Sequence, residues 1–168
     1  VTGNELQQLR TKLDEGKVYE SNSITLKIAL KRIGVKKVKI RRVKDTLEAT
    51  KKAVAKCLAK SDIVLISGGI SVGDYDFVKQ ALEENGVNEV FYKINQRPGK
   101  PIWFGSKKNK LVYALPGNPA SSLSCFYIYA LPVIKAQMGF SAYHLPRLKA
   151  TATSDIKNPT GKTLFLKG

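Results

Sequence analysis

A short apolar run that leads into a glycine-rich, acidic turn limits the folds open to this chain more than any other feature. Ile63–Ile66 has the composition of a buried strand, and the turn Ser67–Asp76 that follows holds three glycines and two aspartates. A helix is predicted over 75–84. Glycines let backbone N–H groups approach a ligand, and a helix start adds partial positive charge. This order of elements therefore predicts an anion site at the edge of an open α/β sheet.

The composition predicts a domain with a real core and no membrane span. Hydrophobic residues make up 43% of the 168 residues, which suits one domain of ordinary size. The longest apolar candidate, Ala120–Met138, is interrupted by serines, Pro132 and Lys135, so it is predicted to be a core helix. Val1–Glu5 lacks the pattern of a signal peptide and no initiator Met is present, so we expect a piece of a longer, cytoplasmic protein.

The cysteine and histidine content gives little support to a zinc site or a disulfide framework. Cys57 and Cys125 both fall in helical apolar patterns, where buried, reduced thiols are expected, as in a cytoplasmic protein. His144 is the single histidine and stands beside Tyr143 and Pro146, which favours a surface or packing role. Two cysteines and one histidine are too few for the usual zinc-ligand patterns.

The net charge of +16 favours an anionic partner. Much of this charge is expected on a solvated face, because Lys37, Lys39 and Arg41 alternate with Val38 and Ile40. That alternation predicts a half-buried edge strand over 37–43. Non-specific nucleic-acid binding is the competing interpretation of the charge. It would need aromatic or base-reading groups among the basic residues, and this segment has none obvious.

The remaining elements alternate between helix and strand. The predicted fold is α/β, a three-layer α/β/α sandwich with a mostly parallel sheet. Ser21 or Ser23 is expected to cap the first helix, Asp45 the second and Asn118 a long helix near the end. Arg147–Thr153 alternates like the first strand of another, β-rich unit. The expected domains are 1–145 and 146–168. The other predicted helices span 24–33 and 45–59, and the predicted strands span 62–67, 89–94, 102–104 and 111–115.

Five motifs occur in an order and spacing that resembles the molybdopterin molybdotransferase family (the MoeA and gephyrin E-domain family). They are Thr2–Leu6, Tyr19–Asn22, Ser67–Asp76, Arg97–Pro101 and Leu115–Pro119. Each motif is modest, but the five together are highly specific and cover the chain to about residue 139. The tail resembles the start of that family's C-terminal β domain. The chain departs from the family pattern at three positions: Asn4 and Glu20 stand where Asp is usual, and Arg97 stands where Lys is frequent.

The resemblance implies a role in molybdenum cofactor synthesis. Members of this family bind adenylylated molybdopterin and molybdate, insert molybdenum into the dithiolene with Mg²⁺, and release AMP. The implied partners are these small anionic substrates, a second copy of the full-length protein in a homodimer and a molybdopterin adenylyltransferase. The isolated domain is expected to be an incomplete enzyme. A gephyrin-type scaffold and a molybdopterin adenylyltransferase-like domain are the alternatives within this resemblance.

The resemblance also implies roles for individual residues. Glu5 and Asp76 would bind the metal ion, and together with Asp45 they would be the catalytic acids. Capping of a helix explains Asp45 equally well, a tight turn alone would explain the glycines, and any single lysine can simply be solvated. The residues expected to bind the pterin, its phosphate or molybdate are Ser21, Asn22, Ser67, Gly68, Gly69, Ser71, Gly73, Asp74, Lys93, Arg97, Lys100, Pro116, Gly117, Asn118, Pro119 and Ser121.

Overall fold

A four-stranded mixed sheet forms the centre of the computed structural model, which describes residues 1–168 except 4, 10, 71–76 and 167–168. The strand order is β3–β7–β6–β4. β3 (Ile63–Ser67) and β7 (Lys110–Leu115) run parallel, whereas β6 (Trp103–Lys107) pairs antiparallel with both β7 and β4 (Asn88–Tyr92). The α/β class is confirmed, but the prediction of a mostly parallel sheet is wrong. β6 and β7 are joined by a tight hairpin, which forces them to run antiparallel.

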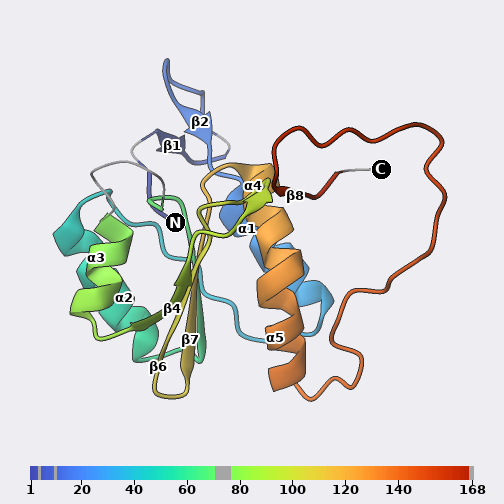
Figure 1. Cartoon of the computed structure of the whole chain (residues 1–168). Helices are drawn as coiled ribbons and strands as arrows, with labels where there is room; N and C mark the ends of the chain where they lie inside the picture. The colour runs from blue at the N-terminus through green and yellow to red at the C-terminus, as the bar shows by residue number, and fades with distance from the viewer. Residues whose placement is uncertain (4, 10, 71–76, 167–168) are drawn as a thin grey trace.

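Helices cover both faces of this sheet (Figure 1). On one face lie α2 (Leu47–Leu58) and α3 (Phe77–Glu84), and on the other lie α1 (Asn22–Arg32) and a long helix near the C-terminus. Side chains alternate between the two faces along each strand. In β7, for example, Val112 and Ala114 join one buried cluster, and Tyr113 and Leu115 join the other. The alternation explains why nearly continuous apolar runs are needed in these strands.

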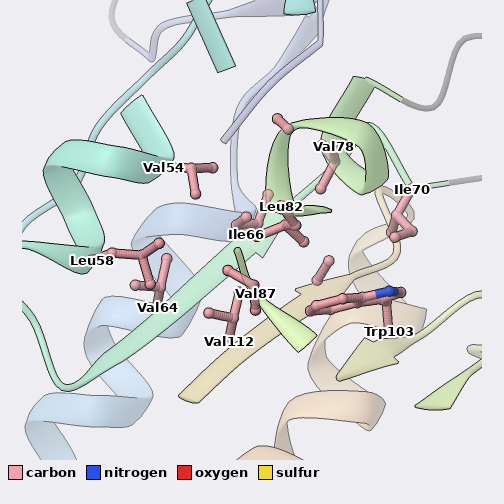
Figure 2. Packing of buried hydrophobic residues seen from close by; sticks show 12 residues of the cluster. Val54, Leu58, Val64, Ile66, Ile70, Val78, Leu82, Val87, Trp103 and Val112 are labelled. Carbon is pink, nitrogen blue, oxygen red and sulfur yellow. The ribbon is translucent and has the colours of Figure 1, made fainter. Parts of the chain in front are cut away.

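Trp103 is the largest fully buried side chain of the cluster beneath α2 and α3. Figure 2 shows it next to Ile70 and Val78, with Val64 and Leu58 further along the same layer. Its indole Nε1 donates a hydrogen bond to Glu89 Oε2 at 2.7 Å, so the polar edge of the ring has a partner. The ring also lies across Gly105, where any Cβ would overlap it.

The predicted helices form, but two of the predicted caps are wrong. Ser21 is the N-cap residue of α1 without a side-chain capping bond, and Ser23 is not the cap either. Instead, the buried carboxylate of Glu20 accepts hydrogen bonds from the backbone N–H and the hydroxyl of Ser23. Thr46, rather than Asp45, caps α2 by accepting from Ala49 N at 3.4 Å. The carboxylate of Glu20 therefore stabilises the start of α1, and Asp45 does not have the capping role that the sequence predicts.

The long helix near the C-terminus consists of α4 (Pro119–Cys125), a π-helical segment η1 (Phe126–Ala130) and α5 (Leu131–Gln137). Asn118 is its N-cap, as predicted, and its Oδ1 accepts from Ser121 N at 3.1 Å. Pro119 occupies the first helical position, where its missing N–H has no consequence. The apolar face of this helix packs into the second buried cluster with α1.

The predicted edge strand over 37–43 does not form. Val43 makes an isolated parallel bridge with Thr2, and the other residues of this segment have no regular structure. An alternating pattern fixes which side chains face solvent, but a strand also needs a neighbour for its backbone groups. Within the described residues, this segment has such a neighbour at Val1 and Thr2 alone.

The tail leaves α5, swings away from the sheet and returns beside α4 (Figure 1). Arg147–Thr153, predicted as a strand, has no regular structure. A strand forms later, where β8 (Thr163–Leu164) pairs in parallel with β5 (Gln96–Arg97). A further short parallel pair joins β1 (Leu6–Gln7) to β2 (Val18–Tyr19). In the part of the chain that the structure describes, no helix has the length and apolarity needed to span a bilayer.

Candidate functional site

The carboxyl ends of β3 and β7 lie at the same edge of the sheet because the two strands are parallel neighbours. Ser67 pairs with Leu115 in the register, so the loops that follow them start side by side. Gly68 N donates to Leu115 O at 3.3 Å, and a Cβ on Gly117 would lie 3.6 Å from Gly68 Cα. The glycine turn and the start of the long helix, two motifs 50 residues apart in the chain, therefore meet here.

Asn22 joins these two loops from a third element. Its Nδ2 donates to Ser67 Oγ at 2.7 Å and to Gly117 O at 2.8 Å. Asn22 is the first residue of α1, so the helix that packs on one face of the sheet also fixes this edge. Both partners are candidate residues from the sequence, and the structure brings all three together.

Thr2 contributes to the site, although it was predicted as part of the first motif and not as a binding residue. Its backbone N donates to Ser67 O at 3.2 Å, and its carbonyl oxygen occupies the place where a Cβ on Gly68 would stand. A Cβ on Gly69 would lie 2.7 Å from Thr2 Cγ2 and 2.8 Å from Val78 Cγ2. Both glycines have positive φ, +85° and +66°. Close packing and backbone conformation therefore both require glycine at these two positions.

Asp45 also lies beside Thr2 and the glycine turn, and it does not cap α2. Its Oδ1 accepts from Thr2 Oγ1 at 2.9 Å and lies 3.9 Å from the position of a Cβ on Gly69. The carboxylate is half-buried against the glycine turn. Because Thr46 caps α2, helix capping does not explain why an aspartate stands at position 45. The carboxylate of Asp45 instead contacts Thr2 and lies beside the glycine turn.

The basic residues of the fourth motif, Arg97–Pro101, occupy a turn that packs on the start of the long helix. The turn Arg97–Lys100 contains a cis Arg97–Pro98 peptide bond, and Gly99 has φ +96°. A Cβ on Gly99 would lie 3.6 Å from Ser121 O, which places the turn against the first turn of α4. Arg97 and Lys100 are exposed there. Ile94 N donates to Lys100 O at 3.0 Å, so the turn is closed by its own backbone.

Lys93 lies at the entrance to this turn. Its backbone N donates to Ile102 O at 3.0 Å and its φ is +61°. Its ammonium group lies 4.6 Å from the centre of the Tyr92 ring. Because the segments before and after the turn pair with each other, Lys93, Arg97 and Lys100 are three positive charges on one closed loop.

Together these contacts form a continuous surface at one edge of the sheet, which we call the candidate site. It runs from Asp45 and Thr2, across the glycines of the turn, to the start of α4 and the basic turn. Of its residues at and just before the start of α4, Pro116 is buried, whereas Gly117, Asn118 and Pro119 are exposed and Ser121 is half-buried. Ser21 precedes Asn22 at the rim. The described residues of the site are Thr2, Ser21, Asn22, Asp45, Ser67, Gly68, Gly69, Lys93, Arg97, Lys100, Pro116, Gly117, Asn118, Pro119 and Ser121.

Part of the predicted site lies outside the described residues: Ser71, Gly73, Asp74 and Asp76, as does Asn4, one of the departures from the family pattern. Glu5 is described, is exposed, and lies on the segment that also carries Thr2. Its carboxylate oxygens lie 2.8 and 2.9 Å from the position of a Cβ on Gly3. Among the described residues, no group of three or more His, Cys, Asp and Glu side chains could hold a metal ion. Asp45 and Glu5 nevertheless supply hard oxygen donors, the type that Mg²⁺ prefers.

A shallow pocket lies beside the candidate site rather than over it. Its volume is about 320 Å³, and its lining includes Gly3, Leu6, Glu20, Arg42 and Lys44. The lining contains none of the described residues that the sequence predicted for the site. Glu20 and Arg42 face each other there at 3.8 Å between carboxylate and guanidinium atoms, and Glu20 also caps α1. These contacts explain Glu20 structurally.

Comparison with known proteins agrees with this geometry. The family described as probable molybdopterin binding domain matches residues 1–136. A molybdopterin molybdenumtransferase of Haemophilus influenzae is 36% identical over 99% of this chain and 41% of its own length. The molybdenum cofactor synthesis protein cinnamon of Drosophila melanogaster is 37% identical over 83% of this chain and 23% of its own length.

A solved structure agrees with the sequence comparisons. The molybdopterin biosynthesis MoeA protein of Pyrococcus horikosii superposes with a TM-score of 0.72 at 30% identity, covering 82% of this chain and 34% of the other. The chain thus spans less than half the length of these relatives. The resemblance seen in the five motifs is confirmed, and the chain belongs to the probable molybdopterin binding domain family.

Proposed function

We propose that this chain is the molybdopterin-binding part of an enzyme of molybdenum cofactor biosynthesis. The complete enzyme would bind adenylylated molybdopterin, insert molybdenum from molybdate into the dithiolene and release AMP. One observation carries the proposal: the side chain of Asn22 donates hydrogen bonds to both Ser67 and Gly117, so residues from three of the family motifs meet at one edge of the sheet. Relatives named for this activity match nearly the whole chain.

The basic turn and the start of α4 would hold the anionic groups of the ligand. Lys93, Arg97 and Lys100 supply positive charge, with arginine adding a planar fork of donors and lysine a compact point charge. Ser121 and the backbone after Gly117 supply neutral donors beside them. The excess of basic residues in the chain, 29 against 13 acidic ones, adds a long-range field that attracts such a ligand.

The glycine turn and its acids would hold the pyrophosphate end and a divalent ion. Gly68 and Gly69 let Thr2 pack directly against the turn, which brings Asp45 beside it. Asp45 and Glu5 would hold Mg²⁺ together with Asp76, whose role we propose from the family motif alone. When bound, Mg²⁺ would neutralise charge on the pyrophosphate that is cleaved. The hydroxyl of Thr2 orients one Asp45 oxygen and leaves the other oxygen for this task.

The dimer, the adenylyltransferase partner, the cytoplasmic location and the division at residue 145 belong to the same proposal. They describe a longer protein of the kind that these relatives represent. Similarity to those relatives is the support for them. In that protein, further domains would complete the site, so the chain by itself is expected to bind ligand and to turn it over poorly.

A binding titration tests the proposal. Molybdopterin and adenylylated molybdopterin are titrated into the chain at near-physiological salt, with and without random oligonucleotide as competitor. Saturable binding that survives the competitor supports the proposal. Binding that the competitor abolishes would instead indicate a general polyanion surface. Lys100→Ala should weaken binding, whereas Lys52→Ala, which removes the same charge from exposed α2, should leave the dissociation constant unchanged.

A further inference from the structure

A buried glutamine connects the basic turn to the long helix. Gln96 immediately precedes the turn and is 3% exposed. Its Nε2 donates to Pro98 O, within the turn, at 2.7 Å. Its Oε1 accepts a hydrogen bond from the hydroxyl of Tyr129, which lies on the π-helical segment η1. Both ends of this amide are therefore used, one toward the turn and one toward the helix.

Cys125 makes a second contact between the same two elements. Its buried Sγ donates to Gly99 O at 3.5 Å, and a Cβ on Gly99 would overlap that sulfur. Gln96 Nε2 lies 3.7 Å from the same Sγ. Burial raises the pKa of Cys125 to about 12, so the thiol keeps its proton and acts as a donor at neutral pH.

The helix presents these groups on one face. Cys125 and Tyr129 are four residues apart, which places them one above the other on a helix surface. Tyr129 falls in the π-helical segment Phe126–Ala130, where Leu131 N bonds to Phe126 O five residues back. Single π-turns of this kind are frequent at functional sites. Here the π-turn carries the tyrosine that reaches the turn.

We propose that Gln96, Cys125 and Tyr129 are positioning residues that set the place of the turn Arg97–Lys100, and through it the affinity for the anionic ligand. The inference rests on the proposed function, in which Arg97 and Lys100 hold that ligand. Both charges sit on exposed, flexible side chains, so the backbone of the turn determines where they can reach. The buried amide of Gln96 and thiol of Cys125 hold that backbone from the side of the long helix, and they do not contact the ligand.

The test combines binding with a double-mutant cycle. Tyr129→Phe removes one hydroxyl and keeps the ring, and we expect the dissociation constant for molybdopterin to rise about three- to tenfold. Tyr127→Phe makes the same chemical change two residues away and should leave the constant unchanged. If Tyr129 acts through the turn, its effect should largely disappear in a background that combines Arg97→Ala with Lys100→Ala, which removes both ligand-binding charges of the turn. Independent, additive effects would overturn the proposal.

A second measurement reads the turn without ligand. Ile94 N donates to Lys100 O and Ile102 N donates to Gly99 O, at 3.0 and 3.2 Å, so the exchange rates of these two amide hydrogens report on the turn. Tyr129→Phe should speed their exchange about tenfold, judged against the amides of β3 and β7 in the same sample. Gln96→Met keeps a side chain of similar length and removes all three hydrogen bonds of the amide, so it should act at least as strongly.

The two readouts separate the possible failures. If the wild-type chain binds no molybdopterin but Tyr129→Phe loosens the two amides, the proposed function is wrong and the positioning of the turn still holds. If binding occurs and neither Tyr129→Phe nor Gln96→Met changes the amides or the affinity, the positioning proposal is wrong and the function stands. Loss of stability alone does not imitate the expected result, because affinity is measured on the folded fraction.

Discussion

The side chain of Asn22 donates a hydrogen bond to the hydroxyl of Ser67, 45 residues later in the chain, at 2.7 Å. The same amide group donates to Gly117 O at 2.8 Å. One side chain at the start of α1 therefore holds together the loops that follow β3 and β7. In the fold, this is where a helix from one face of the sheet reaches the edge that carries the candidate site.

Asn22→Ala should lower the free energy of unfolding by about 1–3 kcal/mol, because the buried hydroxyl of Ser67 and the carbonyl of Gly117 lose their donor. Urea denaturation measures this change. Ser21→Ala is the matched control: Ser21 makes no side-chain capping bond, so its loss should stay within about 0.5 kcal/mol. Equal stability of the two variants would contradict the structural role given to Asn22.

Asp45→Asn should separate charge from hydrogen bonding. The asparagine oxygen can still accept from Thr2 Oγ1, so the stability should change by less than about 0.5 kcal/mol. Any dependence of molybdopterin binding on Mg²⁺ should weaken, because a carboxylate is lost from the site. Calorimetric titration with and without Mg²⁺ checks this.

Thr46→Ala is the converse variant. It removes the observed cap of α2 and should lower the free energy of unfolding by about 1 kcal/mol with no change in affinity. Loss of stability in Asp45→Asn, with none in Thr46→Ala, would restore the capping interpretation of Asp45.

The sequence predicted the elements of the fold better than their pairing. Period-two and helical patterns located β3, β7 and α2 within one or two residues. The same patterns predicted strands at the places of β4 and β6, but they say little about strand direction, and the antiparallel pairing of β4 with β6 was not predicted. The alternating segment 37–43 shows the reverse error. It has the pattern of a strand but, over these described residues, its bridge to Thr2 is the sole pairing.

The motifs predicted many residues of the site, but residues that contribute through contacts with distant side chains were not predicted. Asn22, Ser67 and Gly117 were expected, and the structure joins them. Thr2 and Tyr129 were missed because each acts through one side-chain hydrogen bond to a distant residue, Asp45 and Gln96. No local pattern encodes such a bond.

Gly68→Ala should be much more destabilising than a typical glycine substitution. A Cβ there would overlap Thr2 O, in addition to the cost of φ +85° for an L-residue. Gly16→Ala is the control, because Gly16 has φ +71° and open space around it. The difference between the two variants in thermal or urea denaturation, about 2 kcal/mol or more, measures the close approach of Thr2 to the turn. Equal losses would show that the turn can move away from Thr2.

Buried Cys125 should make the protein less stable as the solution becomes alkaline. Burial raises its pKa from 9.0 to about 12, so below pH 9 the thiol is protonated in both the folded and the unfolded state. Between pH 9 and 12 the unfolded chain releases this proton and the folded protein does not, which lowers the free energy of unfolding by at most about 1.4 kcal/mol per pH unit. Tyr113, with a pKa raised from 10.0 to about 12 by burial, acts in the same direction.

Cys125→Ala should therefore flatten the decline of stability between pH 9 and 11, whatever its effect at pH 7. Urea denaturation at a series of pH values gives the slope for each protein. The variant retains Tyr113, so part of the decline should persist. Identical slopes would show that the thiol is accessible to solvent or ionises normally in the folded protein.

Thr163→Pro should release the tail from β5 while leaving the basic turn in place. Thr163 N donates to Asn95 O at 3.1 Å, and proline removes this donor. The neighbouring bonds from Phe165 N to Arg97 O and from Asn95 Nδ2 to Gly161 O should then weaken. Trypsin should cut the tail faster at its basic residues. Thr151→Pro, in a segment without regular structure, is the control and should not change the cleavage rate.

The affinity of Thr163→Pro for molybdopterin distinguishes two ways of holding the turn. The contacts of Gln96 come from the helix side and survive the substitution, so we expect the dissociation constant to stay within about threefold of the wild-type value. A tenfold or larger loss would instead mean that the tail, through its pairing with Arg97, positions the basic turn. In that case residues 161–165 would be part of the site, and the division of the chain at residue 145 would cut through it.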